Sequence, residues 1–203
     1  IASSPRVANP GCYSTGAIAL LRPLTERGLL PPDFPITINA ISGYSGGGHS
    51  MVKAYEARTA PDFELYALGL EHKHIPEIVH YSRLTRRPIF VPSVADFRQG
   101  MLVSIPLHLD QLPGTPSGAD LHQALVEHYP AGSSVNVIAP ESLIGEDGKL
   151  EPQSLNNSNV MELRVYCNQA RGHAVLVAKL DNLGKGASGA AVQNIELMLG
   201  LKN

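Results

Sequence analysis

Strand-like segments that follow one another over short links are the feature that most restricts the fold of this chain. Ile89–Val94 and Met101–Leu109 are apolar and partly β-branched, and the second alternates apolar residues along its length. Val160–Tyr166 and Ala174–Leu180 also alternate, and the link between them, Cys167–Gly172, indicates a hairpin. Because these strands are neighbours along the chain, a mixed or antiparallel sheet is favoured over a doubly wound parallel one.

Other segments predict helices that pack on this sheet. At 203 residues and 43% apolar composition, the chain can form one domain with a substantial core. The first helix is expected from about Ser14 to Arg27, ended by Gly28 and kinked or shortened by Pro23. Further helices are expected from His49 to Arg58, from Pro76 onward, from Ser117 to Tyr129 with Asp120 completing a cap, and from Ala190 to Leu199. Further strands are expected at Ile36–Ile41, Glu64–Leu70 and Val135–Ile138.

Charge and cysteine content exclude several classes of protein. With a formal net charge of −2 and no basic run, neither nucleic-acid nor anionic-membrane binding is expected. No apolar stretch approaches the roughly 20 residues that span a bilayer. The only cysteines, Cys12 and Cys167, exclude a metal site built from several cysteines and favour a reducing compartment, the cytoplasm. The chain begins at Ile1 without a signal pattern, so we expect the start of the protein to precede it.

A cysteine stands where the first predicted helix begins. In Asn9-Pro10-Gly11-Cys12 a Pro-Gly turn precedes the cysteine, and the apolar run Ala17–Leu21 follows. A thiol at a helix N-terminus lies among unpaired backbone N–H groups at the positive end of the helix dipole, and both favour the nucleophilic thiolate. A buried cysteine without a role is the simpler interpretation of any single cysteine. The residues that accompany Cys12 favour the nucleophile.

Two histidines and a carboxylate form the second candidate group. His72 and His74 are two positions apart, and Glu77 follows. If the strand that starts at Glu64 continues through them, both imidazoles lie on one face. Together with a thiolate, they are the groups that nucleophilic catalysis with proton transfer requires. A metal site is the alternative interpretation of His-x-His, but only Cys12 and Glu77 offer further ligands, so we predict none.

Two glycine-rich segments offer backbone that can approach a ligand. Ser42–Gly48 lacks the Lys-Ser/Thr ending of a phosphate loop, and no G-x-G-x-x-G links a strand to a helix. Leu180–Asn194 is either a tight strand-to-helix turn or a segment that approaches a ligand through Asn182 or Lys185. The chain by itself therefore gives no sign of a dinucleotide-binding domain.

Four motifs in series resemble one enzyme family. Asn9–Tyr13, Ser42–Gly48, His72–Glu77 and Leu180–Gly189 occur in this order, and Ala190–Asn194 extends the last of them. Together they resemble the N-acetyl-gamma-glutamyl-phosphate reductases, the arginine-pathway relatives of aspartate-semialdehyde dehydrogenase. The resemblance extends over essentially all 203 residues, and the series is far more specific than N-P-G-C alone.

The resemblance implies a fold, a cofactor and partners. The family combines an N-terminal Rossmann domain that holds NADP(H) with a second domain that carries the cysteine and the oligomer contacts. This chain resembles the second domain, an α+β fold with a mixed, largely antiparallel sheet, like the C-terminal domain of glyceraldehyde-3-phosphate dehydrogenase. Residues 1–180 would form the catalytic and dimerisation domain, and residues 181–203 a glycine-rich turn and closing helix that pack on the absent Rossmann domain. A cytoplasmic homodimer or homotetramer is expected.

The implied reaction is the NADPH-dependent reduction of N-acetyl-L-glutamyl 5-phosphate to the 5-semialdehyde with release of phosphate. Cys12 would form a thioester, hydride transfer would give a thiohemiacetal, and an imidazole would exchange the proton. His74 is the first candidate for this acid/base role and His72 the second, while Glu77 orients one of them or the substrate. The remaining candidates are Ser42, Tyr44, Ser45, Gly46 and Arg98, with Arg86 and Arg87, for the substrate or its phosphate, and Asn182 and Gly46 for the nicotinamide.

Other interpretations remain open. A sister enzyme that acts on aspartyl phosphate or carrier-bound aminoadipyl phosphate would share this mechanism. A non-catalytic dimerisation and substrate-binding module would leave Cys12 unreactive in a folded protein. A cysteine hydrolase is disfavoured, because its chemistry does not require the segment Asn182–Gly189. The choice of NADP over NAD rests on the resemblance alone.

Overall fold

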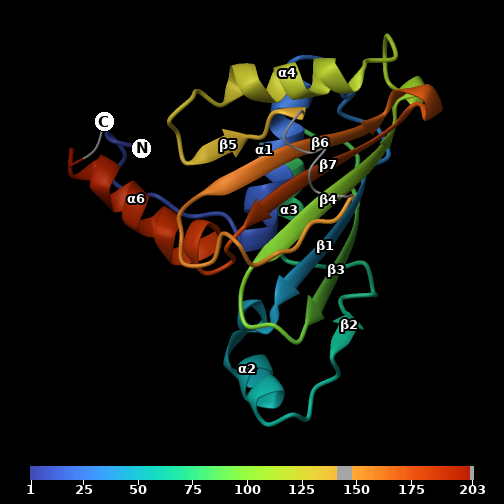
Figure 1. The fold of residues 1–203 in the computed structure, drawn as a ribbon. Helices are drawn as coiled ribbons and strands as arrows, with labels where there is room; N and C mark the ends of the chain where they lie inside the picture. The colour runs from blue at the N-terminus through green and yellow to red at the C-terminus, as the bar shows by residue number, and fades with distance from the viewer. Residues whose placement is uncertain (141–147, 202–203) are drawn as a thin grey trace.

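A mixed sheet of seven strands organises the part of the chain that the structure describes. The computed structural model describes residues 1–140 and 148–201, and its strands have the order β2-β3-β1-β4-β7-β6-β5 (Figure 1). Neighbouring strands are antiparallel except for the parallel pairs β1–β3 and β5–β6. The predicted α+β class with a mixed, largely antiparallel sheet is confirmed. The strands are β1 (Thr37–Gly43), β2 (Phe63–Leu65), β3 (Ile89–Ala95), β4 (Met101–His108), β5 (Val135–Val137), β6 (Met161–Asn168) and β7 (His173–Leu180).

Alternation in the sequence sets which face of the sheet is buried. The odd-numbered positions of β4, from Met101 to Leu107, are all buried, whereas the residues between them are at least partly exposed. The predicted hairpin is confirmed, since β6 and β7 pair antiparallel from Met161 opposite Leu180 to Asn168 opposite His173. One side chain in two therefore enters a common core on one face of the sheet.

Helices α1 (Cys12–Glu26), α3 (Ile75–Tyr81) and α4 (Gly118–His128) supply the other half of this core. α1 packs on β4, β6 and β7 and contacts both other helices, and it lies with α3 behind the sheet in Figure 1. The predicted cap of α4 is confirmed, because the Ser117 hydroxyl accepts the Asp120 N–H while Asp120 accepts the Ser117 N–H.

Pro23 neither ends α1 early nor leaves a polar group unpaired. It lies inside the helix, three residues before its end at Glu26. A proline cannot donate to the carbonyl four residues earlier, which here is Ala19. The Tyr129 hydroxyl donates to this carbonyl instead, at 3.0 Å. The buried carbonyl is thereby satisfied from the residue that follows α4, and the helix continues.

Two predictions about local structure were wrong. The strand predicted over Glu64–Leu70 is only β2, Phe63–Leu65, because the chain then turns through Ala67 and Leu70, whose φ angles are 51° and 58°. The glycine-rich turn after β7 is helical: Gly184–Ser188 forms a π-helical turn, η5, that continues directly into α6 (Gly189–Met198). The other predicted elements are present, with ends shifted by a few residues.

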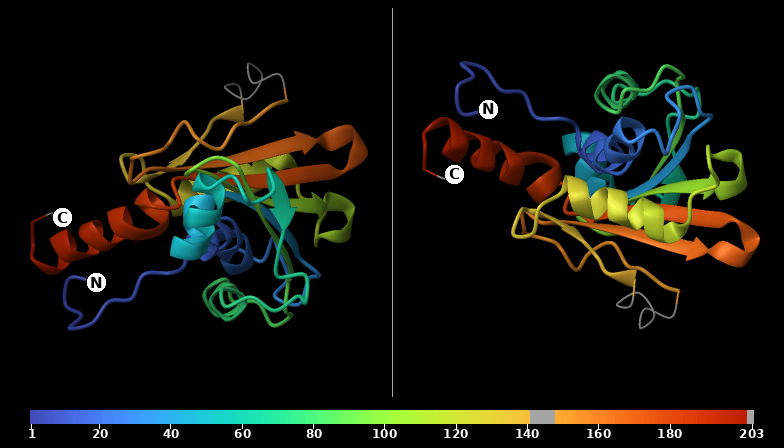
Figure 2. Two further views of the ribbon diagram at one scale, coloured as in Figure 1. Left: turned by 90° about the horizontal axis from the view of Figure 1, so that it is seen from below. Right: turned by 90° about the horizontal axis from the view of Figure 1, so that it is seen from above.

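Two helices lie apart from the core. α2 (Gly48–Glu56) follows the 3₁₀ turn η1 (Tyr44–Gly47) at one end of the sheet. α6 extends away from the sheet beside the N-terminal segment, as both views of Figure 2 show. The Asn194 amide contacts the Asn9 side-chain oxygen there. No residue of α6 is buried, and Val192 and Ile195 are each 54% exposed.

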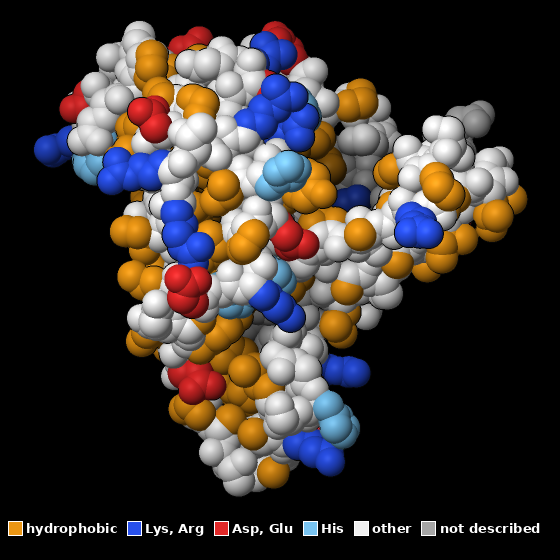
Figure 3. Space-filling view, turned by 180° about the vertical axis from the view of Figure 1, so that it is seen from behind, with side chains coloured by type: hydrophobic (Ala, Val, Ile, Leu, Met, Phe, Trp, Pro, Cys, Tyr) orange, Lys and Arg blue, Asp and Glu red, His pale blue; other side chains and the backbone are white. Residues whose placement is uncertain are grey.

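Within the described residues, every helix is too short or too polar to cross a membrane. On the face that Figure 3 shows, Lys and Arg side chains are interspersed with Asp and Glu, and no large block of positive charge is present.

Candidate active site

A cavity of about 560 Å³ opens at the N-terminus of α1. Cys12 is the first residue of this helix, is half-buried, and has a free thiol. Segments far apart in sequence form the wall: residues 9–13, 45–46, 66, 72–74, 182–183, 186–188 and 191. The structure thus brings the four sequence motifs to one place.

Glu77 supplies the cap that α1 lacks. Gly11 precedes the helix and has no side chain that could cap it. The Glu77 carboxylate accepts the Gly11 N–H at 3.2 Å and the Ser14 hydroxyl at 2.6 Å. A negative charge at this end of the helix is favourable for the helix dipole. Glu77 does not line the cavity, and its hydrogen bonds go to the Cys12 loop and helix rather than to a histidine, which differs from the predicted role.

The two histidines lie in the turn before α3, not on a strand as the sequence predicts. Their ring centroids are 4.6 Å apart at an interplanar angle of 70°. The His74 backbone N–H donates to Nδ1 of His72 at 3.2 Å. Because Nδ1 is the acceptor, a neutral His72 carries its proton on Nε2. The turn itself therefore holds the two imidazoles close together.

Burial keeps both imidazoles neutral. His74 is 8% exposed, and a Cβ on Gly11 would stand 2.1 Å from its Nε2. Burial, helped by His72, lowers the pKa of His74 to about 4, although Glu77 opposes the shift. Burial and the charge of Lys73 lower the pKa of His72 as well. Both rings are therefore neutral at neutral pH, but Nδ1 of His72 already accepts the His74 N–H, so His74 is the ring with a nitrogen free to accept a proton.

The thiol of Cys12 is not the preformed thiolate that its helix position predicts. The backbone N–H groups of Cys12 and Tyr13 and the charge of Lys73 lower its pKa. Burial has the larger effect and, with Glu77, raises the pKa above its ordinary value. Desolvation thus outweighs the helix terminus, and a base is needed to remove the proton.

Two tyrosines that sequence analysis did not single out complete the wall. The Tyr13 hydroxyl donates to the Ser93 carbonyl at 3.0 Å and accepts from the Tyr66 hydroxyl at 3.2 Å. The Tyr13 ring lies about 6 Å from both histidine rings, and burial raises the pKa of its phenol. The position of Tyr13 directly after Cys12 was a usable signal, whereas nothing in the sequence distinguishes Tyr66.

The glycine-rich segments meet at Asn182. Its side-chain oxygen accepts the Gly100 N–H at 2.8 Å, and its amide nitrogen donates to the Ser45 hydroxyl at 2.9 Å. One amide hydrogen of Asn182 is left for a further acceptor. Gly186 lies against the nucleophile, because a Cβ there would stand 2.8 Å from Cβ of Cys12. Of the residues predicted for the substrate, Ser45 and Gly46 line the cavity.

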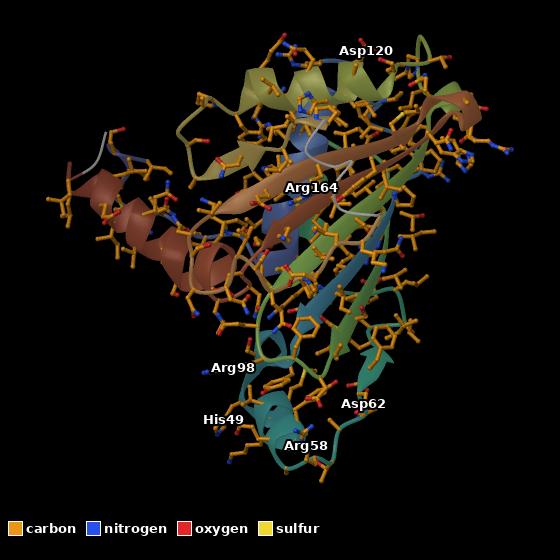
Figure 4. The ribbon with its side chains drawn as sticks, viewed as in Figure 1. His49, Arg58, Asp62, Arg98, Asp120 and Arg164 are labelled. Atoms are coloured by element: carbon orange, nitrogen blue, oxygen red, sulfur yellow. The ribbon has the colours of Figure 1, made fainter. Side chains whose placement is uncertain are left out.

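The other predicted substrate residues lie outside the cavity. Ser42 is buried and its hydroxyl donates to the Gly43 carbonyl, while Tyr44 stacks on Tyr55 of α2 at 4.9 Å. Arg98 points out of the domain beside η1 and α2 (Figure 4), and it lines a neighbouring cavity instead. Neither Arg86 nor Arg87 lines the site, and Arg87 pairs with Glu71.

No three His, Cys, Asp or Glu side chains converge on a possible metal position anywhere in residues 1–140 and 148–201.

Comparison with known proteins identifies the family. Residues 12–182 match the family described as semialdehyde dehydrogenase, dimerisation domain. The chain is 53% identical over 203 residues to the N-acetyl-gamma-glutamyl-phosphate reductase of Chelativorans sp. strain BNC1, covering 98% of this chain and 65% of the relative. It is 51% identical to N-acetyl-gamma-glutamyl-phosphate reductase 2 of Pseudomonas putida, covering 98% and 64%. The chain thus spans just under two thirds of the length of these relatives.

Solved structures share the fold at low identity. Aspartate semialdehyde dehydrogenase II from Vibrio cholerae superposes with a TM-score of 0.68 at 13% identity, over 95% of this chain and 62% of that one. The enzyme from Francisella tularensis gives 0.66 at 12% identity, over 92% and 63%. On the family match, which extends over most of its length, the chain belongs to the semialdehyde dehydrogenase dimerisation-domain family.

Proposed function

We propose that the chain is the catalytic and dimerisation domain of an NADP(H)-dependent reductase of arginine biosynthesis. Its reaction converts N-acetyl-L-glutamyl 5-phosphate to N-acetyl-L-glutamate 5-semialdehyde and releases phosphate. The observation that carries the proposal is a thiol at the head of α1 in one cavity with two neutral imidazoles. The names of relatives at 51–53% identity support the substrate.

The first chemical step needs a base, because Cys12 holds its proton. A neutral imidazole accepts this proton while the sulfur attacks the acyl carbonyl, and phosphate leaves with the bonding electrons to give a thioester. The backbone N–H groups of Cys12 and Tyr13 lie at the sulfur and can stabilise negative charge that develops there or on the carbonyl oxygen.

The hydrogen bonds favour His74 over His72 as the group that accepts the proton. Nδ1 of His72 already accepts the His74 backbone N–H, so a neutral His72 carries its proton on Nε2 and can only donate to a ligand in the cavity. Nδ1 of His74 has no partner among the described residues and Nε2 lies beside Gly11, next to Cys12, so a neutral His74 has a nitrogen lone pair that is free to accept a proton. Its pKa of about 4 keeps this ring unprotonated at neutral pH before the reaction starts.

The residues present fit a nicotinamide. The remaining amide hydrogen of Asn182 can donate to a carboxamide oxygen, and Gly46 and the glycine-rich η5 leave room for a flat ring. A bound reduced nicotinamide supplies the hydride that reduces the acyl group. Cys12 holds the resulting thiohemiacetal until His74 takes its hydroxyl proton and the thiolate leaves as the aldehyde forms. NADP in preference to NAD follows the family resemblance.

The preceding domain and a second copy are the proposed partners. The exposed apolar side chains of α6, Val192 and Ile195, suit the surface of a nucleotide-binding domain that residues 181–203 would cover. The face of the sheet opposite α1 is lined by Ile41, Leu102 and Val175 around a cavity of about 570 Å³. A second copy on this face would account for the family's description as a dimerisation domain. Sedimentation should show a dimer, and Val175→Arg should shift it toward the monomer.

The reaction is tested in the full-length enzyme with Cys12→Ser, against Cys167→Ser as the matched control. Cys12→Ser should abolish turnover of N-acetylglutamate semialdehyde with NADP and phosphate, and Cys167→Ser should not. Mass spectrometry of enzyme with acyl phosphate but no cofactor should find the acyl group on Cys12. His74→Asn should slow formation of this adduct more than His72→Asn if His74 accepts the Cys12 proton.

The alternatives predict different results. A sister enzyme would turn over aspartyl or carrier-bound aminoadipyl phosphate with a higher kcat/KM than the acetylated substrate. A folded full-length protein without turnover or adduct would support the non-catalytic module.

A further inference from the structure

We propose that Lys73 is the residue that binds the departing phosphate, an inference that rests on the proposed acyl-phosphate chemistry. Lys73 stands between the two histidines and lines the Cys12 cavity. No carboxylate in the described ranges forms an ion pair with it.

Lys73 is the one permanently charged side chain among the described residues that line this cavity. The remaining wall consists of neutral polar, apolar and glycine residues, and the two imidazoles stay uncharged because burial lowers their pKa values. Glu77 uses its carboxylate on the far side, at Gly11 and Ser14. The cavity therefore offers an anion one positive charge and no acidic wall residue.

The charge of Lys73 reaches the reacting centre itself. It acts on Cys12, His72 and His74 alike, lowering the pKa of each. In an acyl phosphate the phosphate is bonded to the carbonyl that the sulfur attacks, so its oxygens stay near the sulfur as that bond breaks. The carboxylate at the other end of a glutamyl chain lies several bonds further away. A cation next to the sulfur therefore matches the phosphate better than the carboxylate.

The experiment measures protection of Cys12 in the full-length enzyme without turnover. Iodoacetamide labels Cys12, with exposed Cys167 as the internal reference, while inorganic phosphate is titrated at constant ionic strength and pH. Phosphate should protect Cys12 in the wild type and in Lys73→Arg, and at least tenfold more should be needed in Lys73→Met. Lys53→Met, on exposed α2, is the matched control and should behave as the wild type.

A second readout separates charge from shape. Iodoacetate is anionic and iodoacetamide is neutral, and both react with the thiolate, so the ratio of their rates cancels any change in the pKa of Cys12. This ratio should fall about 5- to 20-fold in Lys73→Met, as expected for one unit charge several ångströms away. An unchanged ratio and unchanged phosphate protection in Lys73→Met would overturn the proposal. Equal protection by acetate would also overturn it, because Lys73 would then be a carboxylate site.

The outcome for Lys73 is independent of the outcome for the reaction. If the proposed function is wrong, Cys12→Ser will retain activity. If only the Lys73 proposal is wrong, Cys12 will be essential for turnover while phosphate still protects Cys12 in Lys73→Met.

Discussion

Gly11 and His74 are in contact so close that residue 11 can carry no side chain: an added Cβ would stand 2.1 Å from Nε2 and 2.5 Å from Cδ2 of the imidazole. The φ angle of Gly11 is −66°, which any residue can adopt, so the constraint is contact and not backbone strain. The ring of His74 is buried and cannot move away freely. Contact with His74, which is far from Gly11 in sequence, therefore explains the glycine of the N-P-G-C motif.

Gly11→Ala tests this contact. The methyl group should displace His74 or the Cys12 loop, lowering kcat/KM by about 100-fold, as a 1 Å misplacement at a reacting centre can do. Urea unfolding should show a loss of about 1–3 kcal/mol from overpacking. Gly69→Ala is the control, because an added Cβ there meets nothing within 4 Å. Wild-type kinetics in Gly11→Ala would contradict the assigned contact.

Gly186→Ala should disturb the nucleophile from the opposite side. Its Cβ would lie 2.8 Å from Cβ of Cys12 and 3.2 Å from the carbonyl oxygen of Asp181, so η5 or the start of α1 must shift. We expect kcat to fall at least tenfold and the iodoacetamide rate at Cys12 to change, while the rate at Cys167 stays constant. Gly69→Ala again serves as the reference. An unaltered Cys12 rate would show that η5 yields without moving the thiol.

The Glu77 cap should appear as coupling between two side chains. Glu77→Ala removes the acceptor and Ser14→Ala the donor of the 2.6 Å hydrogen bond. Because a hydrogen bond to a charged group contributes about 1.5–3 kcal/mol, each variant should be less stable by roughly that amount. The double variant should lose less than the sum of the two, and a double-mutant cycle on urea unfolding measures the difference. Additive losses would mean that the two side chains act separately.

His74 should make the folded protein sensitive to acid. Its pKa is about 4 in the fold against 6.5 in an unfolded chain. Between these values the unfolded state binds more protons, so stability rises with pH and is lost as pH falls from 6.5 toward 4, by about 3 kcal/mol in total. His74→Gln should flatten this part of the pH profile of the free energy of unfolding. The exposed His173→Gln is the matched control variant.

Alternation and turn chemistry carry enough information to predict most of the sheet. The hairpin around Cys167–Gly172 and the cap at Ser117 depend on residues next to one another, and both are present. The parallel pairing of β1 with β3 is not encoded locally, because it depends on where the intervening chain is placed. The end of β2 at Leu65 also escaped prediction, since Glu64–Leu70 is apolar enough for a strand.

For the site, the sequence identifies the reactive residues better than it predicts how deeply they are buried or how their pKa values shift. Cys12 and the histidine pair meet as predicted, since reactive residue types in ordered motifs are a strong signal. The direction of the Cys12 pKa was not predictable, because it depends on how deeply η5 and the turn before α3 bury the thiol. Arginines were poor candidates for the same reason: Arg98 points outward beside η1 and α2 and lines a different cavity.

The route of the chain between the parallel strands β1 and β3 has a consequence for how the protein forms. This connection carries η1 and the turn with both histidines, while Cys12 precedes it and Asn182 comes only after the last strand. No fragment that folds early can form the whole cavity, because residues from both ends of the chain line the cavity. The alkylation rate of Cys12 therefore reports when the cavity forms. During refolding, alkylation of Cys12 should slow relative to that of Cys167 once the complete sheet has assembled.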